Sequence, residues 1–341
     1  MKSTHSLIQI GTIGALIISL FTSGSVLADP FRTTNPKTID PSTEEAFTSI
    51  FQLGDYLKAQ SQLQKAAKNE PLAFALLTGI DYLNQDWKSF EQNAERTLTV
   101  AQNLVKTNPL RGNLYVAVGH FLQGAYSVSI EDPITGTPKA LIKLQQVLKY
   151  LDEAEKVAPN DPEFSLIKGY MDVMLAINLP FSDARQSIDR LEKNASPSYL
   201  VHRGIALAYR DLNQLDKALE YTERALNLTP RNPEIHYLKA QILNLQAQKN
   251  PALFITAAQS YQTALQLSEQ LPKGLVAQIF RNTAQIRLVS TTNQELAMFY
   301  EIKSSSYRVY GVLKQKICPS YSTGGWGNKP VHWLQDGSHS L

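Results

Sequence analysis

This sequence contains very little cysteine and has a small net charge. Cys318 is the single cysteine among 341 residues, which excludes an intramolecular disulfide framework and a cysteine-rich zinc site. The 33 basic and 30 acidic residues leave a formal net charge of +3, which is too weak a field for a polybasic nucleic-acid binder. Hydrophobic residues make up 43% of the chain and charged residues 18%, so we expect a folded protein with a packed interior.

Motifs for catalysis are lacking as well. No two histidines have the i, i+4 spacing of a helical metal site, and the chain contains neither a glycine-rich phosphate loop nor a Gly-x-Ser-x-Gly nucleophile elbow. His202 falls at a core position of the repeat described below, so it is interpreted as a packed side chain. We therefore expect no enzymatic activity, no cofactor and no metal ion.

Long apolar runs are confined to the N-terminus. The stretch over residues 8–21 is too short to span a bilayer comfortably, and Val26-Leu27-Ala28 has the residues that a signal peptidase accepts. This pattern predicts a signal peptide over residues 1–28, with cleavage after Ala28 and an exported chain that begins at Asp29. The expected location is the periplasm, with the thylakoid lumen or the extracellular space as alternatives and an uncleaved anchor as a further one. No membrane span is expected after cleavage, because no later run is apolar enough.

A helix-end pattern recurs along the body of the chain. A small residue is followed seven positions later by another, and a proline follows five positions after that. Small residues seven apart lie on one helix face and allow a neighbouring helix to approach closely. The pattern is carried by Ala59-Ala66-Pro71, Val147-Ala154-Pro159 and Ala218-Ala225-Pro230. Such internal repetition predicts an array of stacked helical units.

The best unit covers residues 199–230 and resembles the tetratricopeptide repeat, a helix-turn-helix of 34 residues. His202 and Thr222 depart from the aromatic residues that the family's pattern has at these places. The positions that match the pattern are Ile205, Ala206, Tyr209, Ala218, Ala225 and Pro230.

The resemblance implies the fold class and the domain organisation. The expected fold is all-α, a right-handed superhelix (α-solenoid) of antiparallel helix pairs. After the signal peptide we expect an extended segment at 29–41, about six repeat units over 42–272, and capping helices over 273–318. A turn-rich insertion is expected at 130–138, and a mobile tail at 319–341. The overall pattern resembles uncharacterised exported tetratricopeptide-repeat proteins of cyanobacteria.

The resemblance also implies where a partner binds, because the first helix of each repeat lines the concave groove of such an array. In the best unit this surface includes Arg203 and Arg210, which are expected to be exposed and to meet carboxylates of a protein or peptide partner. Glu234 lies on the same surface of a flanking unit. The predicted groove residues are Glu163, Leu166, Tyr170, Val173, Arg203, Leu207, Arg210, Tyr237, Gln241 and Asn244. The function expected is that of an exported protein-binding scaffold or assembly factor.

A second class of function stays open. The chain could be an envelope-associated accessory subunit, or an enzyme whose site lies in the insertion or in the C-terminal tail. The tail contains Trp326 and Trp333 after Gly324-Gly325, which fits either a docking segment or disorder. Cys318 is either a buried cysteine or a thiol for intermolecular pairing.

Overall fold

The computed structural model describes residues 29–178 and 184–290, and this part of the chain is all-helical. It contains thirteen α-helices, a single 3-10 turn and no strand, which confirms the expected fold class. The predicted signal peptide, residues 291–318 of the predicted capping helices with Cys318, and the tail at 319–341 lie outside the described residues. Within the described ranges no helix is both long and apolar enough to cross a membrane.

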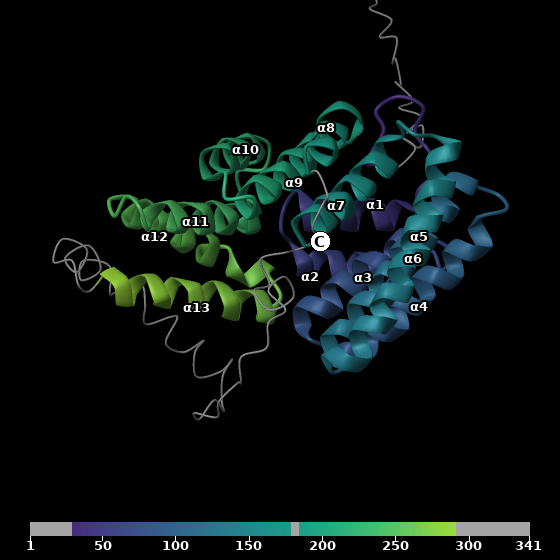
Figure 1. Ribbon diagram of the computed structural model, residues 1–341, viewed down its shortest axis with the longest axis horizontal. Coiled ribbons are helices and arrows are strands. Elements are labelled where there is room, and N and C mark those ends of the chain that lie inside the picture. Colours follow the sequence, from purple (N-terminus) through teal and green to yellow (C-terminus); the bar gives the residue numbers. More distant parts are fainter. Residues whose placement is uncertain (1–28, 179–183, 291–341) are drawn as a thin grey trace, which may run out of the picture.

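The helices follow one another as six neighbouring pairs and a final helix (Figure 1). The first three pairs are α1 (Pro41–Phe51) with α2 (Tyr56–Leu63), α3 (Pro71–Asn84) with α4 (Trp87–Leu104), and α5 (Pro109–Ile130) with α6 (Pro133–Val157). The next three are α7 (Pro162–Asn178) with α8 (Ala184–Asn194), α9 (Ser198–Asp211) with α10 (Leu215–Leu228), and α11 (Pro233–Ala247) with α12 (Leu253–Gln266). The turn η1 (Ser268–Gln270) then leads to α13 (Lys273–Ser290).

Proline marks where helices begin in this fold, more than where they end. Pro71, a proline of the repeating pattern, is the first residue of α3, and Pro109 is the first residue of α5. A proline at this position is well tolerated because its missing N–H would have no helical partner. The residue before it often caps the helix, as Asn108 does by accepting a hydrogen bond from the N–H of Arg111.

The small residues of the repeat pack as the sequence predicts. The side chains of Ala59, Ala154, Ala218 and Ala225 are completely buried between neighbouring helices. Ala66 is an exception, because α2 ends at Leu63 and leaves this residue in the following loop. The alanines set how closely consecutive helices stack.

The prediction of a turn-rich insertion at 130–138 is wrong, because α6 begins at Pro133 and includes Pro138. Only residues 131–132 separate it from α5, and Asp132 caps its first turn by accepting hydrogen bonds from two backbone N–H groups. Gly136 makes the short connection possible. A Cβ there would lie 2.5 Å from the Ser127 carbonyl oxygen of α5, so only glycine lets the two helices meet so closely. Turn-forming residues are used here inside a helical hairpin.

The array closes on itself. The hydroxyl of Tyr56 in α2 donates a hydrogen bond of 2.6 Å to Glu234 in α11, and the Asn232 side chain donates one of 3.0 Å to the Phe51 carbonyl. Figure 1 shows the start of α13 beside α2 and α3, where a Cβ on Gly274 would meet the carbonyl oxygen of Leu83. The first helix pair thus covers part of the surface that an open superhelix would expose.

Candidate binding groove

The inner face of the array forms an apolar groove with a cavity of about 260 Å³. It is built mainly by first helices of successive pairs, which are α1, α3, α5, α7 and α9, together with Phe31 of the N-terminal segment and Phe90 of α4. Its wall is aliphatic, aromatic and sulfur-containing, and Asp211 at the end of α9 is the single acidic residue that the described part of the chain contributes to it. Half-buried side chains around the groove include Phe121, Ile167, Met174 and Ile177. A concave apolar surface with few polar groups is the usual form of a binding site.

Four of the predicted groove residues line this cavity, namely Leu166, Tyr170, Val173 and Leu207. Tyr170 is held in place from both ends. Its hydroxyl donates a hydrogen bond of 2.7 Å to the Leu200 carbonyl, and its ring lies against Gly204, where a Cβ would come within 2.6 Å of the ring. Burial raises the pKa of Tyr170 above its usual value, so the hydroxyl stays protonated.

The sequence predicts that Arg203 is exposed, but in the structure this residue is buried. Its side chain is 4% exposed and forms an ion pair of 2.7 Å with Glu234, which also accepts the bond from Tyr56. The physical reason is the closure of the array, since α2 packs where an open groove would leave Arg203 in water. Its Nη1 atom is buried without a hydrogen-bond partner among the described residues.

The remaining predicted residues of α9 and α11 do not line the groove either. Arg210 is buried, and its guanidinium binds Asp211 at 2.7 Å and Gln241 at 3.0 Å. Tyr237 is buried and its hydroxyl accepts a hydrogen bond of 2.8 Å from Asn282. Asn244 is half-buried on α11. The packing of α9, α11 and α13 against one another uses these polar groups internally.

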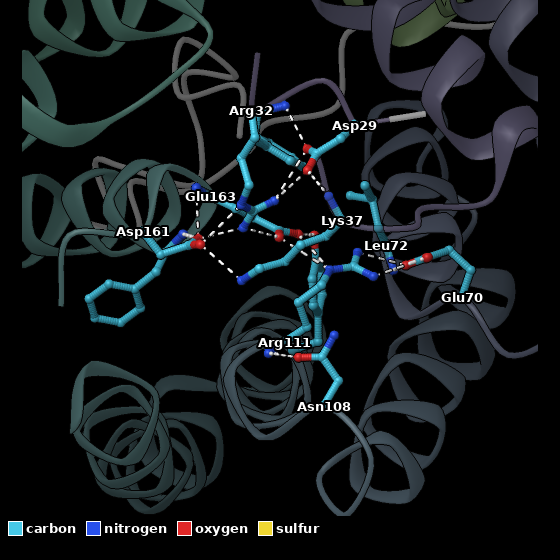
Figure 2. A network of polar contacts seen from close by, with 12 residues as sticks. Asp29, Arg32, Lys37, Glu70, Leu72, Asn108, Arg111, Asp161 and Glu163 are labelled. Carbon is cyan, nitrogen blue, oxygen red and sulfur yellow. Dashed lines mark hydrogen bonds and ion pairs between the residues drawn. The ribbon is translucent and has the colours of Figure 1, made fainter. Parts of the chain in front are cut away.

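Glu163, expected on the concave surface, is instead the centre of a buried polar network (Figure 2). Its carboxylate accepts hydrogen bonds from Arg111 Nε at 3.1 Å and from the Tyr115 hydroxyl at 2.8 Å. Arg111 also binds Glu70 at 2.9 Å. These residues belong to the starts of α3, α5 and α7, so the network ties the first turns of three successive pairs together.

The N-terminal segment joins the same network. Arg32 binds Asp161 at 2.5 Å, Glu163 at 3.1 Å and Asp29 at 2.9 Å, and Lys37 binds Asp161 at 3.0 Å (Figure 2). The predicted extended segment is therefore anchored to the start of α7, although about 130 residues of sequence separate the partners. The sequence carries a weak signal for this network, because an acidic residue follows the first proline of both α7 and α11.

Asp161 in this network is ionised at neutral pH. Burial acts to raise the pKa of Asp161, but the hydrogen bonds and charges of Arg32 and Lys37 outweigh it and hold this pKa below its usual value. Burial, followed by the charge of Glu163, raises the pKa of Tyr115 well above its usual value. Each carboxylate is thus paired with a cation, which is the pattern of a structural ion network.

Side chains that could hold a metal ion do not cluster in the described ranges. These ranges contain no group of three His, Cys, Asp or Glu side chains placed to hold a metal ion. His202 is half-buried beside Tyr221, with ring centroids 6.0 Å apart, and burial lowers its pKa. These facts agree with the interpretation of His202 as a packed residue.

Comparison with known proteins identifies the repeat. A family model for the tetratricopeptide repeat matches residues 199–232, which confirms the repeat that the sequence predicts there. No curated protein matches the chain. The resemblance to cyanobacterial exported proteins stays a prediction.

Two solved structures match the chain at low similarity. The human IFIT1 dimer with m7Gppp-AAAA is 17% identical with a TM-score of 0.43, and the match covers 81% of this chain and 61% of that one. The human IFIT1 dimer with PPP-AAAA is 17% identical with a TM-score of 0.40, covering 75% and 59% respectively. The chain thus spans about three fifths of the length of these structures.

Proposed function

We propose that this tetratricopeptide-repeat chain is an exported scaffold that holds an apolar segment of a partner protein in its inner groove and catalyses no reaction. The observation that carries the proposal is the groove itself, an apolar cavity lined by the first helices of five successive pairs. Helical repeat arrays in general bind proteins on their concave surface. Export to the periplasm rests on the N-terminal apolar stretch and the Ala28 cleavage site.

The chemistry of the groove selects the class of partner segment. Arginines predicted to meet an acidic peptide are already paired, Arg203 with Glu234 and Arg210 with Asp211. The wall instead offers aromatic rings and the flexible side chains of Met171 and Met174. Methionine adapts to varied apolar shapes and is frequent at surfaces that accept several partners. We therefore infer that aliphatic or aromatic side chains of the partner enter the groove, and that nucleic acid does not.

A second candidate function, that of an envelope-associated accessory subunit, is favoured by the outer face of α6. Ile134, Leu141 and Leu148 lie seven residues apart on one side of this helix, and all three are exposed, Ile134 by 85%. Ile142 beside them is 60% exposed. An exposed apolar stripe of this kind marks an interaction surface. In this alternative α6 docks onto a larger assembly.

Affinity capture from the exported fraction tests both candidates. The bait is the mature chain, compared with a groove variant, Leu207→Gln, and an outer-face variant, Leu141→Gln. Proteins that bind through the groove are expected to be lost with Leu207→Gln and retained with Leu141→Gln. The opposite pattern would favour the accessory-subunit function, and capture that persists only without nuclease treatment would point to nucleic acid. A set of captured proteins that neither substitution alters would refute both.

A further inference from the structure

The groove and the tryptophan-containing C-terminal segment are two features that the proposed function leaves unconnected. The chain has three tryptophans, and two of them, Trp326 and Trp333, lie in the segment 319–341 after a pair of glycines. We propose that in the absence of a partner this segment occupies the inner groove of its own chain and inserts its tryptophan side chains into the apolar cavity. The inference rests on the proposed function, because it requires the groove to be a binding site.

The end of the described chain lies within reach of the groove. Gly274, near the start of α13, packs against the carbonyl of Leu83, and the neighbouring Tyr82 lines the groove. From that contact α13 runs for its 18 residues, which is about 27 Å at the rise of an α-helix. The segment that follows Ser290 therefore starts about one helix length away from the edge of the groove.

The length of the connecting chain fits that distance. Trp326 lies 326 − 290 = 36 residues beyond the end of α13. At about 3.3–3.6 Å per residue, a fully extended chain of this length spans at most about 120–130 Å, several times the length of α13. A segment that is tethered within reach of its binding site has an effective concentration on the order of 1 mM. A segment with only weak intrinsic affinity would fill the groove under these conditions.

The groove also suits tryptophan chemically. The rings of Tyr82, Phe90 and Phe121 lie on its wall, where an indole can make edge-to-face or offset contacts. The indole N–H needs an acceptor when it is buried, and the carboxylate of Asp211 at the end of α9 can accept more than one hydrogen bond. Among the described residues, no lysine or arginine lines the cavity.

Tryptophan fluorescence of the mature full-length chain tests the proposal. Trp87 on α4 packs on Tyr82 and Phe90, so Trp87→Phe keeps an aromatic ring there and leaves the two C-terminal tryptophans as the only emitters. The measurement is acrylamide quenching of this protein, repeated with Leu207→Gln in the groove and with Leu141→Gln on the outer face of α6. Thermal unfolding confirms that each variant is folded.

The expected result follows from the effective concentration. For an intrinsic dissociation constant on the order of 0.1 mM, the groove is occupied about ten times more often than it is empty. Quenching should therefore be several-fold weaker than in a free peptide of residues 319–341. Leu207→Gln should bring it towards that of the peptide, and Leu141→Gln should leave it unchanged. Quenching equal to that of the free peptide before any groove substitution would overturn the proposal.

A second measurement separates this inference from the proposed function. The full chain with Trp326→Ser and Trp333→Ser is titrated with a hydrophobic fluorescent dye. Its apparent dye affinity is expected to rise about tenfold, because the competing segment is weakened. Leu207→Gln should abolish this gain. Dye binding that depends on Leu207 but not on the tryptophans would leave the groove as a binding site and refute its occupation by the C-terminal segment.

Discussion

The ion pair between Arg203 and Glu234 offers a quantitative test of the closed array. The two side chains are 4% and 2% exposed, and their charged atoms are 2.7 Å apart. Removing one member of such a pair leaves a charge buried without compensation, which typically costs about 3–5 kcal/mol. Arg203→Met is therefore expected to lower the free energy of unfolding by that amount. An exposed groove arginine would change it by no more than about 0.5 kcal/mol.

The chain contains a matched control for this substitution. Arg224 and Glu220 form an ion pair of 2.6 Å on α10, with side chains that are 47% and 56% exposed. Water already solvates both charges, so Arg224→Met should cost less than about 1 kcal/mol. The same residue types are thus compared in two environments that differ mainly in burial.

Urea denaturation followed by circular dichroism measures both effects. A double variant, Arg203→Met with Glu234→Gln, removes both charges and keeps an acceptor for the Tyr56 hydroxyl. It should recover much of the loss, with a coupling free energy of at least about 2 kcal/mol between the two positions. If Arg203→Met costs no more than Arg224→Met, Arg203 is in water and the closure of the array is wrong.

Three further predictions follow from the packing, the ion network and the N-terminus. Ala225→Leu should destabilise the stack by about 1–3 kcal/mol, because it overpacks a fully buried position. Ala252→Leu, at an exposed position, should be neutral in the same thermal unfolding assay, and equal effects of the two substitutions would contradict the repeat register. Because the folded-state pKa of Asp161 is depressed, its stabilising contribution is present above its unfolded value near pH ~3.9 and is lost as the pH falls further. Acid unfolding of Asp161→Asn should therefore show a weaker pH dependence in that window than the unsubstituted chain, and identical curves would refute the role of this carboxylate. N-terminal sequencing of the exported protein should begin at Asp29, and Met1 on that form would contradict the predicted cleavage.

Local sequence patterns account for much of the helical architecture. Alanines seven residues apart identified the buried seams at Ala218 and Ala225, and the unit at residues 199–230 identified the repeat. These features depend on residues within one or two helices, so their signals lie close together in the sequence. The same local reasoning failed at residues 130–138, where turn-forming residues lie in a helix. There the contact of Gly136 with Ser127 of α5 outweighs the local preference.

The position of the groove was predicted in part. Leu166, Tyr170, Val173 and Leu207 line it, because first helices face inward in any array of this type. The charged members of the predicted set, Glu163, Arg203 and Arg210, are buried instead of exposed. Glu163, for example, is buried by partners that lie 48 to 131 residues away. No local pattern identifies such partners.

The sequence by itself determined the helices, their boundaries near proline, and the alanine seams that stack them. Only the tertiary structure decided whether the array stays open or closes, and with it whether Arg203 faces water or Glu234. The physical reason is that small rotations between successive pairs add up along the chain. Their sum places α2 against α11 through Tyr56 and Glu234, which are 178 residues apart, and this total is not encoded in any single repeat.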